Sequence, residues 1–174
     1  ALMFAAQEGH LEVAEILLDN GAYIEAETRS GCKALFCAAG AGQLEMVKFL
    51  LQRGASITGR TRAGWGVLSN AVRENHVAVT KVLLDAGADP AAVDKEGNPP
   101  LAVAAAIGAS GIATLLLNAG AAGDWRTPYG ETALMKAAYG GHVAVIRTLV
   151  KAGAEVKAQD FDGATALLWA AERG

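Results

Sequence analysis

The feature that most constrains this chain is a pattern that recurs every 33 residues along its 174 residues. Leucines recur at this step, and each leucine after the first follows a glycine by four residues. One short unit cannot bury its own apolar residues, so the pattern predicts stacked units that share a continuous core. The recurring leucines are Leu2, Leu35, Leu68, Leu101, Leu134 and Leu167, and the glycines are Gly31, Gly64, Gly97, Gly130 and Gly163.

Residues 127–159 show how one unit is expected to begin. Gly130 can adopt the backbone angles that a tight turn needs. Thr132 is suited to cap a helix over residues 133–139, in which Leu134 and two alanines have helical spacing. Two glycines follow these residues and are expected to end the helix.

A second, more apolar helix is expected over residues 143–152 of the same unit. Gly153 then stands where a left-handed residue commonly ends a helix. The predicted apolar face of this helix consists of Val145, Ile146, Leu149 and Val150.

The unit resembles the ankyrin repeat, whose pattern is Gly-x-Thr-Pro-Leu-His-x-Ala-Ala, then Gly-His-x-x-x-Val-x-x-Leu-Leu, then Gly-Ala-Asp. This pattern is matched by residues 130–155 (GETALMKAAYGGHVAVIRTLVKAGAE) and by residues 1–23 (ALMFAAQEGHLEVAEILLDNGAY). The resemblance implies an all-α solenoid of stacked helix-turn-helix units joined by turn or β-hairpin fingers. The family's Thr-Pro-Leu-His varies to Lys-Ala-Leu-Phe at residues 33–36 and to Pro-Pro-Leu-Ala at residues 99–102, which indicates natural divergence rather than a consensus design.

We expect residues 1–174 to form a single array of such repeats. Its first and last units are incomplete, so we also expect the sequence to be a segment of a longer protein. The expected units are about 1–27, 28–60, 61–93, 94–126, 127–159 and 160–174.

Composition and charge favour a folded chain without a general affinity for polyanions. Hydrophobic residues make up 52% and charged residues 19%, and the formal net charge is −3. Charge is nevertheless distributed unevenly. Residues 1–27 contain six acidic residues and no lysine or arginine, whereas residues 28–81 contain eight basic residues and two acidic ones.

Residues 97–123 contain no charged side chain and are long enough to suggest a membrane span. They also contain two adjacent prolines and five glycines, and they keep the 33-residue period. We therefore expect no insertion into a membrane.

The three histidines, His10, His76 and His142, occupy equivalent positions 66 residues apart. Neighbouring histidines would lie two repeats apart, roughly 20 Å by the spacing of packed helices, which is too far for shared metal ligation. In ankyrin repeats such histidines form hydrogen bonds to turn backbone, and the resemblance implies the same role here. No metal or other cofactor is expected.

The two cysteines, Cys32 and Cys37, form neither a disulfide framework nor a zinc motif. Cys37 is expected on the buried side of its helix, and the histidine position of that repeat holds Gln43, so no base is available for a cysteine nucleophile. We expect no enzymatic activity, and we expect a reducing location in the cytoplasm or the nucleus.

The segment TGRTRAGWG, residues 58–66, has two glycines spaced like the ends of a phosphate-binding loop. Such a loop needs Lys and then Ser or Thr after its second glycine, but Trp65 and Gly66 follow Gly64. Gly64 is also one of the recurring turn glycines. The segment is therefore interpreted as a repeat turn whose arginines and tryptophan are free to contact a partner.

The resemblance implies that partners bind the concave side, formed by the fingers and the exposed face of each first helix. Exposed aromatic and arginine side chains are the types that dominate interface energetics, so they mark the candidates for binding a protein partner or another part of the same chain. The candidate residues are Arg29, Arg60, Arg62, Trp65, Arg73, Lys95, Arg126, Tyr129, Tyr139 and Phe161.

These candidates form two expected zones. Arg29, Arg60, Arg62, Trp65 and Arg73 form a basic zone suited to an acidic or phosphorylated segment, and Tyr129, Tyr139 and Phe161 form a more apolar zone. An alternative is that the aromatic residues only shield turn backbones. Two other functions stay open, a structural or regulatory role without a separate ligand and, less favoured by the acidic net charge, binding of nucleic acid. The sequence does not determine the oligomeric state.

Overall fold

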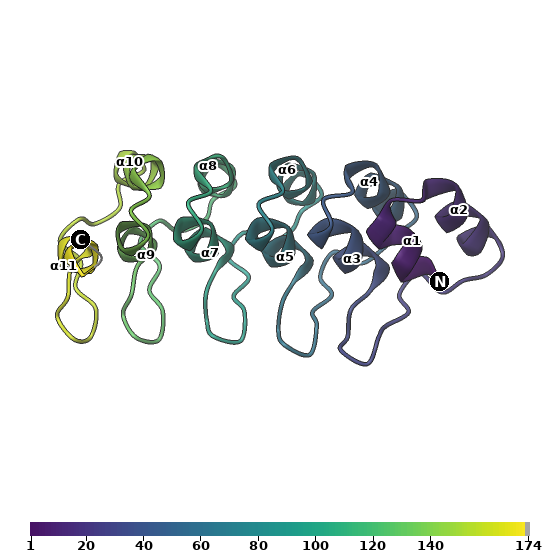
Figure 1. Cartoon of the computed structure of the whole chain (residues 1–174), viewed down its shortest axis with the longest axis horizontal. Coiled ribbons are helices and arrows are strands. Elements are labelled where there is room, and N and C mark those ends of the chain that lie inside the picture. Colours follow the sequence, from purple (N-terminus) through teal and green to yellow (C-terminus); the bar gives the residue numbers. More distant parts are fainter. Residues whose placement is uncertain (173–174) are drawn as a thin grey trace. The chain divides into compact units, whose positions relative to one another are not determined.

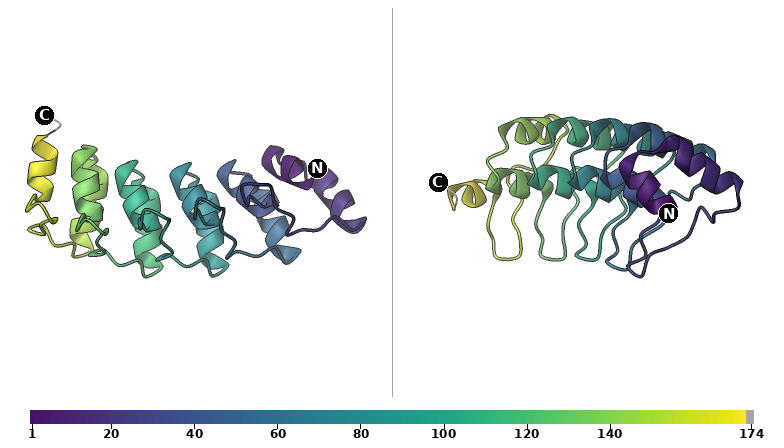
Figure 2. Two further views of the ribbon diagram at one scale, coloured as in Figure 1. Left: turned by 90° about the horizontal axis from the view of Figure 1, so that it is seen from below. Right: turned by 45° about the vertical axis from the view of Figure 1, so that its right-hand side comes forward.

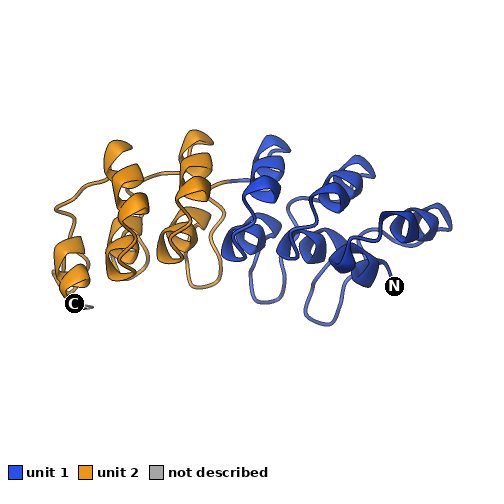
Figure 3. Cartoon of the chain, turned by 45° about the horizontal axis from the view of Figure 1, so that its top comes forward, with its two compact units in different colours: residues 1–89 blue, residues 90–174 orange. Residues whose placement is uncertain are grey.

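The computed structural model describes residues 1–172 of the chain. Backbone contacts divide the chain into two compact units, Ala1–Asp89 (unit 1) and Pro90–Gly174 (unit 2), which are coloured separately in Figure 3. Each unit is built from pairs of short helices, as the 33-residue pattern predicts. That a single array runs through both units stays a prediction.

Unit 1 contains three helix pairs, labelled in Figure 1. The first helices of the pairs, α1, α3 and α5, pack against one another in chain order, and the second helices, α2, α4 and α6, form a parallel row beside them. The fingers extend from the row of first helices (Figure 2). The bounds are α1 Leu2–Glu8, α2 Leu11–Asp19, α3 Ala34–Gly40, α4 Leu44–Gln52, α5 Val67–Arg73 and α6 Val77–Asp85.

Unit 2 repeats this arrangement with two helix pairs and one further helix among its described residues. The first helices α7, α9 and α11 pack in order, and α8 packs against α10. The bounds are α7 Pro100–Ala106, α8 Ser110–Asn118, α9 Ala133–Tyr139, α10 Val143–Lys151 and α11 Ala166–Ala171.

Alanine pairs explain how the short first helices pack so closely. Ala38 and Ala39 of α3 are fully buried, and Ala104 and Ala105 of α7 are equally buried. Alanine is a strong helix former, and its small side chain lets neighbouring helices approach. Most of the largest fully buried side chains belong to the second helices, among them Leu50, Leu83, Ile112, Leu116 and Leu149.

The recurring leucines are buried in every repeat except the last one described. Those from Leu2 to Leu134 are between 1% and 7% exposed, but Leu167 in α11 is 79% exposed.

The predicted unit at residues 127–159 agrees closely with the structure. Helix α9 spans the predicted residues. The Thr132 side chain caps it, because its hydroxyl oxygen accepts a hydrogen bond from the Met135 N–H at 3.3 Å. Helix α10 ends at Lys151 rather than at residue 152. Gly153 has a φ of 91°, in the left-handed region as predicted.

Two residues predicted on buried helix faces are less buried than expected. Val150, predicted on the apolar face of α10, is 45% exposed because only Val145 and Leu149 of that helix point fully into the core. Cys37 in the middle of α3 is half-buried rather than buried. Burial, followed by the nearby Cys32, raises the pKa of its thiol.

The histidines bond to backbone, as the resemblance implies. Nε2 of His76 lies 3.0 Å from the carbonyl oxygen of Gly40, and Nε2 of His142 lies 3.0 Å from that of Ala106. Gln43 donates to the carbonyl of Gln7 at 3.0 Å from the same position. The bonded carbonyl lies at the end of the preceding repeat's first helix, 36 residues earlier, so the contact ties consecutive repeats together. For His10 this offset falls before the first residue.

Candidate functional site

The fingers share one backbone construction in both units. Each finger is a five-residue turn in which the first residue, a threonine or aspartate, exchanges hydrogen bonds with the fifth. The first N–H donates to the fifth carbonyl at 2.9–3.0 Å, and the first side-chain oxygen accepts from the fifth N–H at 2.7–3.2 Å. The fourth residue is the recurring glycine, with φ of 79–80° in every finger. The fingers are residues 28–32, 61–65, 94–98, 127–131 and 160–164.

The second residue of each finger lies at its exposed tip, and its chemistry changes along the chain. It is cationic in the first three fingers and apolar in the last two. Because the surrounding turn is the same, the tips differ in the chemistry of their side chains. The tip residues are Arg29, Arg62, Lys95, Pro128 and Phe161.

Neighbouring fingers are joined at their tips by a backbone hydrogen bond. In unit 1 the N–H of Arg62 donates to the carbonyl of Ser30 at 2.9 Å, and in unit 2 the N–H of Phe161 donates to Tyr129 at 3.1 Å. Pro128 occupies the same position but has no N–H, so it cannot donate the corresponding hydrogen bond to the finger that precedes its own. Two pairs of fingers therefore have a fixed spacing.

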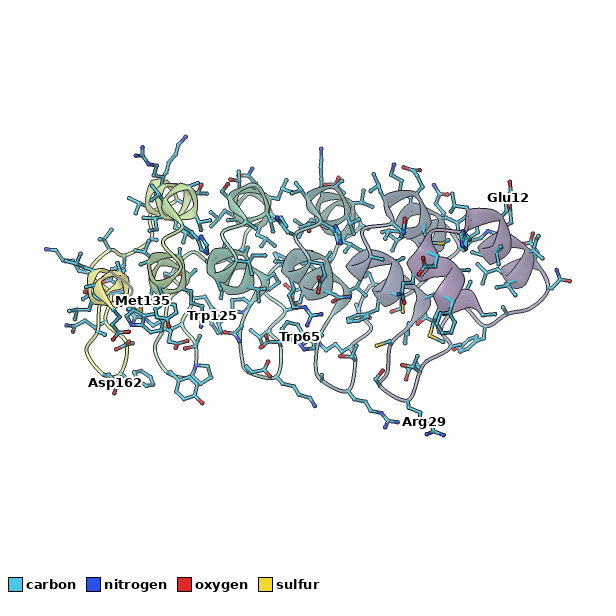
Figure 4. The ribbon with its side chains drawn as sticks, in the orientation of Figure 1. Glu12, Arg29, Trp65, Trp125, Met135 and Asp162 are labelled. Carbon is cyan, nitrogen blue, oxygen red and sulfur yellow. The ribbon has the colours of Figure 1, made fainter. Side chains whose placement is uncertain are left out.

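Two predicted residues at the tips of unit 1 have unpaired charges. Arg29 and Arg62 are exposed, and among residues 1–172 neither guanidinium has a carboxylate within 4.0 Å. Arg29 is labelled at the tip of its finger in Figure 4. Arg60 differs, because its Nη1 donates to the carbonyl of Gly64 at 3.0 Å and so braces its own finger.

Trp65 and Arg73 come together beside these tips. The guanidinium carbon of Arg73 lies 5.0 Å from the centroid of the Trp65 ring, in a cation–π contact. Arg73 also pairs with Glu74 at 3.1 Å and donates to Asn70 Oδ1 at 3.2 Å. Part of its charge is thus neutralised within unit 1, which the sequence did not predict for the basic zone.

An ion pair that sequence reasoning missed supports the base of the first finger. Lys33 Nζ lies 2.8 Å from Glu25 and 3.4 Å from Glu27, and the backbone N–H of Ser56 donates to Glu25 at 2.7 Å. Burial acts to raise the pKa of Glu25, but the hydrogen bonds from Lys33 and Ser56 and the Lys33 charge lower it overall. The hydrogen bond to Glu25 is the main cause that raises the pKa of Lys33. The charge of Lys33 is therefore paired within unit 1, whereas the charges of Arg29 and Arg62 at the tips are not.

The predicted aromatic residues of unit 2 occupy two places. Tyr129 is 70% exposed and Phe161 is 78% exposed, on fingers joined by the backbone bond described above. Tyr139, 40% exposed at the end of α9, packs edge-on against Trp169 of α11 with ring centroids 5.9 Å apart. Trp169 in turn donates to Asp160 at 2.8 Å. Sequence reasoning did not single out Trp169, since its partners lie in different segments.

The cationic residues predicted in unit 2 also differ from one another. Lys95 is exposed at a finger tip. Arg126 instead donates to the carbonyl of Gln159 at 2.6 Å and pairs with Glu155 at 3.4 Å, so it ties two repeats together. Trp125 beside it is half-buried.

Asp160 is held as a carboxylate by its finger. The hydrogen bond from Trp169 is the main cause that lowers its pKa; burial opposes this, and the backbone N–H groups of Ala164 and Asp162 add to the lowering. In the equivalent finger of unit 1 a neutral threonine, Thr61, occupies this position.

No group of three or more His, Cys, Asp and Glu side chains within residues 1–172 is arranged to hold a metal ion. Both cysteines carry free thiols. Within the same residues, no helix has the length and apolar character needed to cross a bilayer.

Comparison with protein families matches repeat models along nearly the entire chain. A model described as ankyrin repeats (3 copies) matches residues 1–61, and two described as ankyrin repeats (many copies) match residues 68–117 and 116–167. No curated protein matches the chain significantly.

Proposed function

The chain belongs to the ankyrin repeat family, and from this premise we propose that its finger tips and the exposed ends of its first helices bind a protein partner. Ankyrin repeats are generally protein–protein interaction modules and are typically not enzymes. The observation that carries the proposal is the pair of unpaired guanidinium groups of Arg29 and Arg62 on two joined fingers. Neither charge has a role in the fold that would explain it.

The partner segment proposed for unit 1 is acidic or phosphorylated. Guanidinium groups donate paired hydrogen bonds to carboxylates and phosphates, and these charge-assisted bonds are stronger than neutral ones. The backbone hydrogen bond from Arg62 N–H to the Ser30 carbonyl, 2.9 Å long, fixes the spacing of the two fingers. A fixed surface loses less conformational entropy when it binds.

Other predicted residues would contact the partner segment or maintain the shape of the fingers. The Trp65 ring offers an aromatic face that Arg73 already covers on one side at 5.0 Å, so it would contact apolar parts of the segment. Arg60 keeps its finger in shape through Gly64. Of the predicted residues in unit 2, Lys95 is the one at a tip with a cationic charge.

The test compares two double charge reversals of equal size. Arg29→Glu with Arg62→Glu alters the tips, whereas Lys81→Glu with Arg147→Glu alters two exposed positions on second helices. Fluorescence anisotropy would measure binding of a labelled glutamate-rich peptide with a phosphoserine. We expect the tip variant to weaken binding by about tenfold or more and the control to have little effect. Circular dichroism should be the same for both.

Equal affinity of the two variants would overturn the proposal for unit 1. A mobility-shift measurement with generic RNA and DNA tests the alternative of nucleic-acid binding, because a nucleic-acid binder would show steep salt dependence. Absence of binding by any peptide would favour the other alternative, a structural or regulatory role without a separate ligand. We also propose a reducing intracellular location, which the two free thiols of Cys32 and Cys37 support.

A further inference from the structure

Unit 2 presents two large aromatic rings to solvent on neighbouring fingers. Tyr129 is 70% exposed and Phe161 is 78% exposed. Single exposed apolar side chains are common on protein surfaces, but adjacent rings on a projecting turn mark an interaction surface more strongly. We call Tyr129, Phe161 and Asp162 the aromatic–acidic surface.

The fold holds these rings in place. The N–H of Phe161 donates to the carbonyl of Tyr129 at 3.1 Å. The Phe161 ring lies on Gly130 so closely that a Cβ built there would be 2.8 Å from Phe161 Cδ1. Each finger is also closed by its own turn, in which the side chain of Thr127 or Asp160 accepts a hydrogen bond from a backbone N–H. The backbone of both residues is therefore fixed, and the Phe161 ring is preorganised for a partner.

The charge around the rings is negative. Asp162 is exposed at the third position of its finger, and Figure 4 labels it at the tip. Among residues 1–172 it has no cationic partner within 4.0 Å. Asp160 at the base of the same finger keeps its carboxylate bonded to Trp169 at 2.8 Å.

Two cationic side chains near the finger at residues 127–131 are already paired. Lys136 pairs with Glu131 at 2.7 Å, and Arg126 pairs with Glu155 at 3.4 Å. No cationic side chain of the described fingers 127–131 and 160–164 offsets Asp162, because neither finger contains lysine or arginine. Aromatic faces beside an unpaired carboxylate form an environment that attracts a cation.

We propose that the aromatic–acidic surface binds a segment of a protein partner through an arginine side chain of that segment. The planar guanidinium would stack on the rings of Tyr129 and Phe161 and donate hydrogen bonds to Asp162. Arginine suits this surface better than lysine, because a guanidinium can stack and pair at once.

This inference rests on the proposed function only in that both assign partner binding to fingers. It concerns other residues, in the other unit, and a partner segment of opposite charge. Either can therefore fail while the other stands.

The test uses the whole chain and two labelled peptides that differ only at their arginine positions. The first is a short arginine-containing peptide, and the second has citrulline, the neutral isostere, at each arginine. We expect the arginine peptide to bind about tenfold more tightly by fluorescence anisotropy, and added salt should weaken it. Equal binding of the two peptides would overturn the proposal, since it would indicate an uncharged apolar partner.

Three variants locate the binding. Phe161→Ala and Asp162→Asn should each weaken the arginine peptide by about two- to fivefold. Asp85→Asn, which removes an exposed carboxylate at the end of α6, should leave its affinity unchanged. An equal loss in D85N would overturn the location, as would unchanged binding in both F161A and D162N. Circular dichroism of each variant establishes that the repeats remain folded.

The Arg29→Glu, Arg62→Glu variant separates this inference from the proposed function. It should lose the acidic peptide and keep the arginine peptide. Loss of the arginine peptide in this variant would place its binding in unit 1 and overturn the inference.

Discussion

The fingers of unit 1 and the last two fingers of unit 2 have the same backbone and different surface chemistry. In both units a threonine or aspartate closes the turn and a glycine with φ of 79–80° completes it. At the second position unit 1 has Arg29 and Arg62, whereas the last two fingers of unit 2 have Pro128 and Phe161. A position that the fold leaves exposed can thus change its charge without any change in the turn.

The comparison separates two kinds of residue in each finger. The glycine and the first residue determine the turn, so substitution there should affect stability in both units. The second and third residues contact solvent, so substitution there should affect binding.

The largest expected effect on stability comes from a glycine on which a tip residue rests. Gly130 and Gly163 have the same φ, 80° and 79°, so alanine should cost each about 1–2 kcal/mol in the free energy of unfolding. A Cβ on Gly130 would also lie 2.8 Å from the Phe161 ring, whereas one on Gly163 has nothing within 4 Å among the described residues. Gly130→Ala should therefore lose about 1–3 kcal/mol more, measured by urea unfolding. Equal losses would mean that the ring does not rest on Gly130.

Thr80 is a buried difference between the units that should respond in the opposite direction. It is fully buried in α6, and its hydroxyl has no hydrogen-bond partner among the described residues. The equivalent residue in unit 2 is Ala113, also fully buried. Thr80→Val keeps the shape and removes the unpaired hydroxyl, so it should raise the free energy of unfolding by about 1–3 kcal/mol. Thr80→Ser is the control, because it keeps the hydroxyl, and a gain in that variant would contradict the explanation.

Asn75 gives a smaller expected gain in unit 1. It has a φ of 60° between α5 and α6, where the equivalent residues of unit 2, Gly108 and Gly141, have φ of 75° and 68°. Asparagine tolerates this left-handed conformation but glycine adopts it freely. Asn75→Gly should therefore stabilise the protein by about 0.5 kcal/mol in thermal and urea unfolding. A loss of stability would show that the asparagine side chain has a contact worth more than the backbone strain.

Asp160 should make unit 2 respond to acid in a way that its threonine counterpart in unit 1 cannot. Its pKa is lowered in the folded state, so the carboxylate contributes stability at pH values above its unfolded pKa of about 3.9. That contribution is lost as pH falls through the lower folded value. Asp160→Asn should therefore show a smaller loss of stability between about pH 5 and pH 3 than the wild type. An unchanged pH dependence would contradict the role of the Trp169–Asp160 bond.

Features set by the repeat itself were predictable from the sequence. The turn glycines, the Thr132 cap and the bounds of α9 follow from residues close together in the chain. Local signals fix such features because a turn or a cap depends on a few adjacent residues. The end of α10 differed from the prediction by one residue, within the usual uncertainty of helix ends.

The state of each charged candidate could not be predicted, since it depends on contacts between segments. Arg29 and Arg126 have the same charge, yet the first is unpaired at a tip and the second reaches the carbonyl of Gln159 at 2.6 Å. Trp65 and Arg73 face each other only after the finger folds back on α5. The sequence therefore identified the candidate surface but not which of its charges remain available.

An exchange of finger tips tests most directly whether tip chemistry determines binding. The substitutions Pro128→Arg, Tyr129→Ser, Phe161→Arg and Asp162→Ala give the last two fingers of unit 2 the tip residues of unit 1. In isothermal titration we expect this variant to bind the acidic phosphopeptide at two sites instead of one and to lose the arginine peptide. One acidic-peptide site together with unchanged arginine-peptide affinity would contradict the claim that the exposed tip residues determine what each unit binds.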